Sequence, residues 1–276
     1  MIHHERNYEK YLLMNRLPHM WCSGCGNGII MKAIAKAIEL YNIDEDNVVI
    51  VSGIGCSSRA YSYMNLDSIH TVHGRAIPFA TGIKLANPKL KVIVITGDGD
   101  CTAIGGNHFI HAARRNIDLT VVLFNNNIYG MTGGQASPLT PKGKKATTTP
   151  YGSIDRSFDV CELAKAAGAT YIARSTTYHV QLLVDLILQG ISNNGFSLVE
   201  VITQCVTNYG RRNGIGDASK MLLWMKENAV NIKDYKRTIN DGESDKFPIG
   251  VLRKISEPEY STEYNKIINR VWRREE

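Results

Sequence analysis

The stretch Val92-Ile93-Val94-Ile95-Thr96-Gly97-Asp98-Gly99-Asp100 joins an apolar, β-branched run to a turn made of two glycines and two aspartates. An apolar run without polar alternation is typical of a strand that is covered on both faces of its sheet. Similar runs lie at 48–53, 119–124, 171–173 and 198–203, and segments of helical period lie at 28–41, 77–86, 105–115, 160–167 and 180–192. This alternation predicts a three-layer α/β domain built on a parallel sheet.

The turn Gly97–Asp100 lies just beyond its strand, where ligands bind in sheets of this kind. Glycine lets backbone N–H groups approach a phosphate closely, and an aspartate can hold a magnesium ion that bridges two phosphates. The next predicted strand ends at Asn125-Asn126-Asn127, and Asn126 stands 28 positions after Asp98. A GDG followed by an NN at about this spacing is the signature of thiamine diphosphate bound through Mg²⁺. The alternative, two unrelated polar turns, is disfavoured by the Gly-rich Tyr129–Gln135 directly behind.

Four of the six cysteines fall in loops or at predicted strand ends: Cys22, Cys25, Cys56 and Cys205. One site can therefore collect them, and four thiolates suit a [4Fe–4S] cluster or a zinc ion equally well. Cys101 and Cys161 belong to apolar helical segments, so we expect them to be buried as small hydrophobic residues.

Length and composition exclude several classes of protein. The 276 residues contain no apolar stretch long enough to span a membrane, and the start Met1–Arg6 lacks the apolar core of a signal peptide. We therefore expect a cytoplasmic protein. The formal charge of +6 could attract an acidic protein partner, but no basic stripe interleaved with aromatics indicates nucleic-acid binding.

The chain divides by composition at about residue 208. We expect residues 1–208 to form the α/β domain and 209–276, which are more charged, to be an appendage that packs on this core or on a partner. Within the first part, the polar segment Tyr129–Ser157 is long enough to be a lid or a binding loop.

The chain resembles the β subunits of 2-oxoacid:ferredoxin oxidoreductases over residues 20 to 205, and it is most similar to the short β subunits of the 2-oxoglutarate enzymes (KorB type). The resemblance is carried, in the family's order, by Pro18–Gly28, Gly53–Arg59, His73–Gly82, Gly97–Asp100, Asn125–Gln135 and Cys205.

This resemblance implies a thiamine diphosphate-binding, pyrophosphate-domain fold and assigns roles to individual residues. A [4Fe–4S] cluster would be held by Cys22, Cys25, Cys56 and Cys205, and Mg²⁺ by Asp98, Asn126 and the Ile128 carbonyl. The cofactor would be contacted by Gly55, Cys56, Ser57, Ser58, Gly97, Gly99, Asp100, Gly130, Met131 and Thr132.

The activity implied is oxidative decarboxylation of a 2-oxoacid, with 2-oxoglutarate giving succinyl-CoA. Coenzyme A takes the acyl group, and electrons pass singly through the cluster to ferredoxin. An α subunit supplies the activating glutamate, and small γ and δ subunits are candidates for further partners. The alternatives are a pyruvate or branched-chain enzyme of the same family, another thiamine enzyme, or a Zn- or Fe–S-binding electron-transfer or scaffold subunit without catalysis.

Three further residues are candidates for substrate contact. The Arg59 guanidinium can pair with a substrate carboxylate, although a surface salt bridge is the alternative. His73 is either a donor to the substrate or a core histidine with its hydrogen bonds satisfied. Met131 would be a flexible apolar selector of substrate size.

Overall fold

The computed structural model describes residues 7–238 and 245–272. Residues 1–6, on which the expectation of no export signal rests, lie outside the described residues, as do 239–244 and 273–276. Within the described part of the chain, no helix is both long and apolar enough to cross a membrane.

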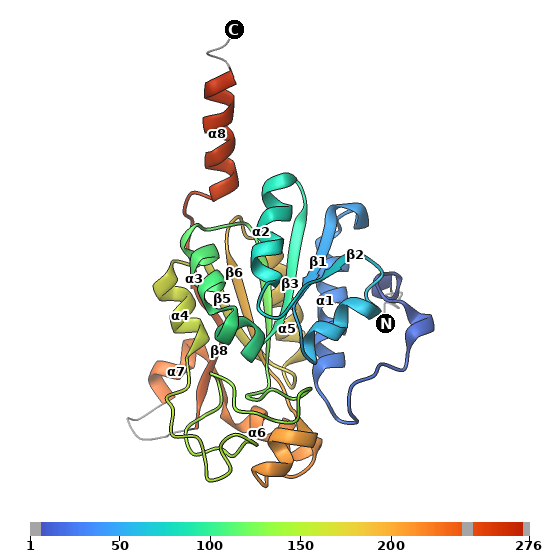
Figure 1. Cartoon of the computed structure of the whole chain (residues 1–276), viewed down its shortest axis with the longest axis vertical. Helices are drawn as coiled ribbons and strands as arrows, with labels where there is room; N and C mark the ends of the chain where they lie inside the picture. Colours follow the sequence, from blue (N-terminus) through green and yellow to red (C-terminus); the bar gives the residue numbers. More distant parts are fainter. Residues whose placement is uncertain (1–6, 239–244, 273–276) are drawn as a thin grey trace.

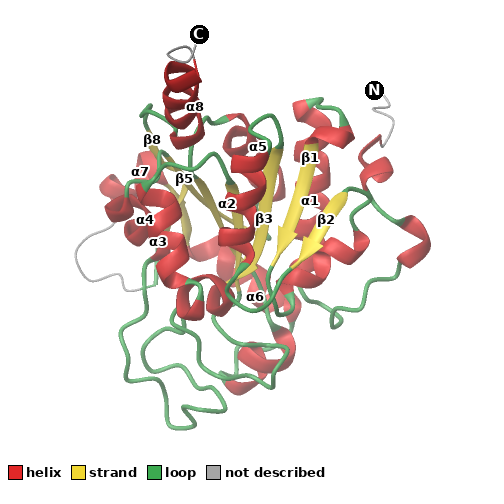
Figure 2. Cartoon of the chain, turned by 45° about the horizontal axis from the view of Figure 1, so that its top comes forward, coloured by secondary structure: helices red, strands yellow, loops and turns green. Residues whose placement is uncertain are grey.

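One sheet organises the molecule (Figure 2). In residues 7–238 and 245–272 it has eight strands in the order β2-β1-β3-β4-β6-β5-β8-β7. The strands are β1 (Val48–Ser52), β2 (Asp67–His70), β3 (Lys91–Gly97), β4 (Thr120–Asn125), β5 (Tyr171–Thr176), β6 (Ser197–Ile202), β7 (Ala229–Asn231) and β8 (Phe247–Lys254). All five strands expected from the sequence are present.

The sheet is parallel from β2 to β5, and β8 then pairs with β5 in the antiparallel direction. β8 comes from the C-terminal segment, so residues 209–276 contribute strands to the sheet rather than only packing against it. β2 is a four-residue edge strand whose side chains are all exposed, and it therefore lacks the apolar pattern that predicts a buried strand.

Helices cover both faces of this sheet, which confirms the three-layer prediction (Figures 1 and 2). One face packs on α1 and α5, and the other packs on α2, α3 and α4. Successive strand residues supply the two cores, with Ile93 and Ile95 on one side and Val92 and Val94 on the other. The five helices span Asn27–Tyr41 (α1), Ala76–Ala86 (α2), Gly106–Arg114 (α3), Val160–Ala167 (α4) and Val180–Ser192 (α5).

Two buried cysteines belong to these cores. Cys101 and Cys161 are 2% and 3% exposed and lie in the layer of α2, α3 and α4. Burial raises the pKa of both thiols well above the ordinary value. The expectation that they act as small hydrophobic residues is confirmed.

The register of β3 and β4 places two polar turns side by side. Gly97 at the end of β3 pairs with Phe124 near the end of β4, so the segments after them leave the same edge of the sheet. The segment Tyr129–Ser157 lies beyond this edge (lower part of Figure 1) and contains only an isolated bridge between Tyr129 and Gln135.

The C-terminal segment ends in a helix that stands away from the body. After the turn Val206–Gly210 the chain forms α6 (Ala218–Asn228), α7 (Ile232–Thr238) and α8 (Tyr260–Trp272). Figure 1 shows α8, in red, projecting from the end of the molecule opposite to the segment Tyr129–Ser157.

Candidate active site

Asp98 is a buried carboxylate at the end of β3. It is 4% exposed, and one of its oxygens accepts a hydrogen bond from the Ser137 hydroxyl. Burial raises the pKa of Asp98 to about 7, although hydrogen bonds from Ser137 and from the backbone N–H groups of Gly99 and Ile128 lower it. A carboxylate buried in this way is held ionised by a nearby positive charge.

The three asparagines after β4 have separate partners. The Asn125 amide donates to Glu200 at 2.7 Å, and the Asn127 carbonyl accepts from the Thr140 hydroxyl at 2.6 Å. The Asn126 oxygen accepts from the Ile128 N–H at 3.2 Å, which turns the chain sharply beside Asp98. Of the three, only Asn126 faces the cavity that Asp98 also lines.

This first cavity encloses about 130 Å³. That is well below the roughly 300 to 1,000 Å³ of sites that enclose a whole ligand, so it forms one wall of a larger site. All but one of the residues expected to contact a cofactor line it: Gly55, Cys56, Ser57, Gly97, Asp98, Gly99, Asp100, Asn126, Ile128, Gly130, Met131 and Thr132.

Ser58 is the exception among the expected contacts. It lies inside the 3₁₀ helix Ser57–Tyr63, is 0% exposed and does not line the cavity. The cavity is also lined by three residues to which the sequence analysis gave no role: Ile54, Phe124 and Tyr129. The Tyr129 hydroxyl donates to the Gly99 carbonyl at 3.3 Å, and a Cβ on Gly99 would lie only 2.1 Å from the tyrosine ring. Position 99 therefore requires glycine.

Asp100 ties the loops of this edge together. Its carboxylate accepts hydrogen bonds from the backbone N–H groups of Ile54 and Gly74 and from the Thr96 hydroxyl. A Cβ on Gly53 would lie 1.9 Å from the same carboxylate, so that loop also packs directly on it. Asp100 therefore borders the cavity, but its carboxylate accepts its hydrogen bonds from loops of the protein itself.

His73 borders the same cavity and is not enclosed in the core. Its side chain is 38% exposed, and its Nδ1 lies 2.7 Å from an Asp100 carboxylate oxygen, at an angle too poor for a hydrogen bond. The ring also lies edge-on to Tyr129, with centroids 6.1 Å apart. His73 is therefore held at the cavity by Asp100 and Tyr129.

A second cavity, here called the cysteine cavity, brings together the four cysteines singled out from the sequence. It encloses about 130 Å³, and its lining includes Cys22, Cys25, Cys56 and Cys205. Burial, aided by the charges of the neighbouring thiolates, raises the pKa of Cys25 to about 12 and that of Cys56 to about 11. The thiols of Cys25 and Cys56 are therefore neutral at pH 7 unless a cationic group binds them.

The two cavities share a wall. Cys56, Asn126, Gly130 and Met131 line both. A Cβ on Gly130 would lie 3.5 Å from the Cys56 sulfur and 3.6 Å from the Cys205 sulfur, so the backbone there passes directly over the thiols. Whatever occupies one cavity is thus separated from the other by a single layer of the chain.

Arg59 lines the cysteine cavity and not the first one. Among residues 7–238 and 245–272 its guanidinium has no carboxylate within ion-pair distance, so the alternative of a surface salt bridge has no partner here. Met131 is 43% exposed on the shared wall.

The fold and the first cavity define a thiamine-binding domain, and comparisons with known proteins agree. The model for thiamine pyrophosphate enzymes, C-terminal TPP binding domain, matches residues 53–201. The chain is 53% identical to the 2-oxoglutarate synthase subunit KorB of Methanocaldococcus jannaschii, over 95% of this chain and 97% of that protein. It is 45% identical to the same subunit of Archaeoglobus fulgidus, over 94% of each chain.

A solved structure shares the whole architecture. It is the 2-oxoglutarate:ferredoxin oxidoreductase from Magnetococcus marinus with 2-oxoglutarate, coenzyme A and succinyl-CoA bound. The TM-score is 0.85 at 32% identity, covering 98% of this chain and 92% of that chain. The chain belongs to the β subunits of the 2-oxoacid:ferredoxin oxidoreductases, in the KorB group, and thiamine diphosphate is its cofactor.

Proposed function

We propose that this chain, together with an α subunit, catalyses the oxidative decarboxylation of 2-oxoglutarate to succinyl-CoA and passes the electrons to ferredoxin. The observation that carries the proposal is the shared wall of Cys56, Asn126, Gly130 and Met131. A reaction that leaves reducing electrons beside thiamine needs an acceptor close by, and the cysteine cavity is adjacent. The names of the similar proteins support 2-oxoglutarate as the substrate.

The first cavity fits a metal-bound diphosphate. Asp98, Asn126 and the Ile128 carbonyl would hold Mg²⁺, since they present the hard oxygen ligands that this ion prefers. The buried Asp98 also lacks a cationic partner within ion-pair distance among the residues that the structure describes. Gly97, Gly99, Gly130 and Thr132 would lie against the phosphates, where the absence of a Cβ at the glycines permits close approach. When bound, thiamine diphosphate supplies the nucleophilic carbon that allows a 2-oxoacid to lose CO₂.

The cysteine cavity fits an iron–sulfur cluster better than zinc. A zinc ion needs its thiolates about 2.3 Å from one point, and within residues 7–238 and 245–272 no three His, Cys, Asp or Glu side chains converge in that way. A [4Fe–4S] cluster presents its iron atoms at separate corners, so its four thiolates stand further apart. Cys22, Cys25, Cys56 and Cys205 all line one cavity, and they are the four thiols that would hold such a cluster.

Met131 would face the substrate from the shared wall, and Arg59 from the neighbouring cysteine cavity. Within residues 7–238 and 245–272 the Arg59 guanidinium has no carboxylate at ion-pair distance, so it is available for a carboxylate of the 2-oxoacid. His73, whose Nδ1 lies 2.7 Å from the Asp100 carboxylate, lines the first cavity and would donate to the substrate there. Among the described residues that line the first cavity there is no glutamate, and we infer that the α subunit supplies the activating one.

The cluster is tested by iron and sulfide analysis of the complex purified without oxygen. Cys22→Ala and Cys205→Ala should each lose most of the iron and the broad absorption near 400 nm, because each removes a ligand. Cys101→Ala, a buried cysteine outside the cavity, is the control that should retain both. An unchanged iron content in Cys22→Ala and Cys205→Ala would place the cluster on another subunit and overturn this part of the proposal.

A further inference from the structure

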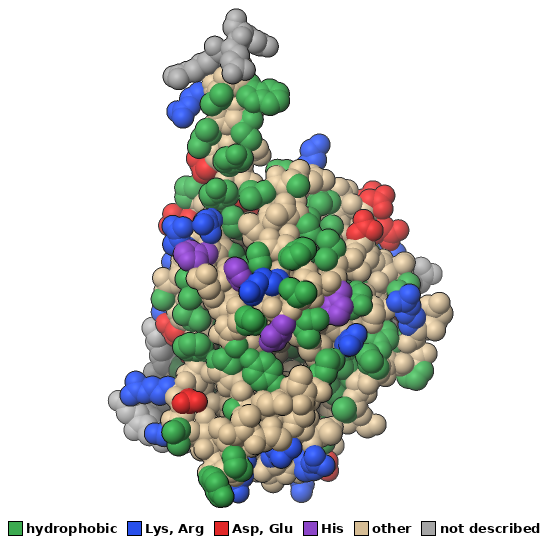
Figure 3. Space-filling model, in the orientation of Figure 1, with side chains coloured by type: hydrophobic (Ala, Val, Ile, Leu, Met, Phe, Trp, Pro, Cys, Tyr) green, Lys and Arg blue, Asp and Glu red, His purple; other side chains and the backbone are tan. Residues whose placement is uncertain are grey.

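The projecting helix α8 carries an apolar seam that nothing in the described residues covers (Figure 3). Tyr260, Tyr264, Ile267 and Val271 are 37%, 50%, 49% and 49% exposed. Their spacing of four, three and four residues is that of the core positions of a coiled coil, which line up on one face of a helix. Solvated helices do not normally leave such a face open to water.

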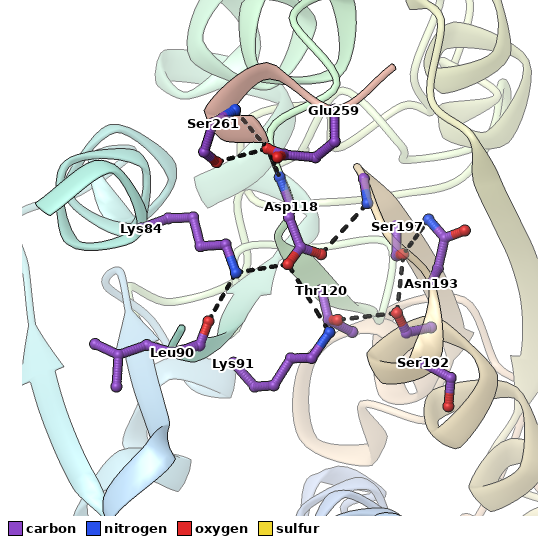
Figure 4. A network of polar contacts seen from close by, with 12 residues as sticks. Lys84, Leu90, Lys91, Asp118, Thr120, Ser192, Asn193, Ser197, Glu259 and Ser261 are labelled. Carbon is purple, nitrogen blue, oxygen red and sulfur yellow. Dashed lines mark hydrogen bonds and ion pairs between the residues drawn. The ribbon is translucent and has the colours of Figure 1, made fainter. Parts of the chain in front are cut away.

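The base of α8 is fixed to the core, so its direction is set by the body of the protein. Glu259 accepts hydrogen bonds from the backbone N–H groups of Asp118 and Ser261 (Figure 4). It also accepts one from the Thr262 N–H. Asp118 in turn is held by Lys84, whose Nζ lies 2.6 Å from its carboxylate. The seam is therefore presented by an anchored helix and not by a loose tail.

The position of α8 argues against the partner that completes the active site. Glu259 contacts Asp118 just before the amino end of β4, whereas the two cavities lie at the carboxyl ends of β3 and β4. A subunit that closes the first cavity faces that carboxyl edge. Figure 1 shows α8 extending from the end of the molecule opposite to that edge.

The charges beside the seam are complementary to those of a second α8 in antiparallel orientation. With Tyr264 and Ile267 as adjacent core positions, Glu263 and Arg270 occupy equivalent flanking positions one heptad apart. Glu263 also forms an exposed ion pair with Lys266 of its own helix at 2.6 Å, which leaves its second carboxylate oxygen for a partner helix. In an antiparallel pair, Tyr264 of one helix faces Ile267 of the other, and Glu263 faces Arg270 twice by symmetry. In a parallel pair, Glu263 would instead lie opposite Ile268 and would gain no charge partner.

We propose that α8 is a dimerisation element, which pairs with α8 of a second copy of this chain about a two-fold axis. The helix of 13 residues is about 20 Å long, so the seam is short, and the charge pairs set its orientation. This inference does not depend on the proposed chemistry, because α8 is remote from both cavities.

The test measures the mass of the purified complex with its α subunit across a dilution series. Ile267→Lys combined with Val271→Lys should halve the mass at micromolar concentration, with activity per site retained. Asn265→Lys combined with Asn269→Lys adds the same charge to the polar face of α8 and should leave the mass unchanged. An unchanged mass in the first variant, or loss of the α subunit from it, would overturn the proposal.

A charge exchange distinguishes self-pairing from any other occupant of the seam. Glu263→Arg alone should weaken the association several-fold, because it places like charges opposite each other. Adding Arg270→Glu in the same chain should restore it, since each exchanged residue then meets its complement on the second copy. If the double exchange associates no better than the single one, a different protein covers the seam.

Discussion

At the scale of single residues, Ser137 determines how the Asp98 carboxylate is presented. Its hydroxyl donates to one carboxylate oxygen, and the Leu139 N–H donates to the same hydroxyl at 3.3 Å. Thr140, three positions on, holds the Asn127 carbonyl. One short segment thus fixes both turns that carry the expected metal ligands.

We therefore expect Ser137→Ala to weaken binding of Mg²⁺ and thiamine diphosphate by about 10- to 100-fold, the usual effect of losing a residue that orients a metal ligand. Calorimetric titration of the apo-protein measures the affinity without relying on turnover. Ser192→Ala, which removes an exposed hydroxyl on α5, should bind with the affinity of the natural chain. If both variants bound with the affinity of the natural chain, Ser137 would have no part in orienting the Asp98 carboxylate for the metal.

Arg59 is the residue whose role is most open to kinetic test. Arg59→Ala should raise the KM for 2-oxoglutarate more than the KM for coenzyme A, because it removes a charge partner of the 2-oxoacid only. Arg59→Lys should recover part of the loss, since lysine keeps the charge but not the planar fork. Parallel rises in both KM values would argue against contact with the substrate.

At the scale of elements, the sequence predicted those whose pattern is local. The apolar runs of β3 and β4 predict both strands, and a parallel arrangement of these strands predicts that Asp98 lies near Asn126, as the register confirms. β2 was missed because its four side chains are all exposed. Ser137 was missed because its partner lies 39 positions away and no motif joins them. Ser58 was expected at the cofactor, but the 3₁₀ helix turns it into the interior.

The stability of the amino-terminal cap of α8 should depend on pH through the Glu259 carboxylate. Burial raises the pKa of Glu259, but hydrogen bonds from Ser261 and Thr262 outweigh it and leave the pKa below the ordinary value. A carboxylate with a lowered pKa stabilises the fold above its unfolded pKa, and this contribution is lost as the pH falls through its folded pKa.

Glu259→Gln should therefore lower stability by about 1 kcal/mol at pH 7, the usual value of a helix cap. The difference from the natural chain should shrink as the pH falls below about 4.5. Thermal unfolding followed by circular dichroism over a pH series measures it. A difference that stays constant from pH 7 to pH 3 would mean that the charge of Glu259 has no part in the cap.

At the scale of the whole molecule, one buried ion pair joins the sheet, α2 and the C-terminal segment. Lys84 is 4% exposed and also donates to the Leu90 carbonyl at 2.9 Å. Lys91 lies 3.8 Å from the same Asp118 oxygen that Lys84 contacts, and Asp118 also accepts from the Gly195 N–H. The carboxylate thus joins the segment that carries Lys84 and Lys91 to Gly195, and the backbone N–H of Asp118 donates to Glu259 of the C-terminal segment.

Lys84→Met should destabilise the protein by about 3 to 5 kcal/mol, because it leaves a buried carboxylate with only a distant partner. Adding Asp118→Asn should recover much of that loss by removing the unpaired charge. Chemical denaturation of the three proteins gives the free energies of unfolding. If the double variant were as unstable as the single one, the loss of stability would come from the packing of the Lys84 side chain and not from its charge.

The link between Ser137 and Asp98 also has a consequence for the maturation of the enzyme. The segment Tyr129–Ser157 closes over the carboxyl edge through the same carboxylate that we assign to the metal. Cofactor loading and the position of this segment would then be coupled, because both act on Asp98. We expect limited proteolysis within residues 129–157 to be slower for the protein loaded with thiamine diphosphate and Mg²⁺ than for the empty one, and this difference would let a cell distinguish mature chains from immature ones.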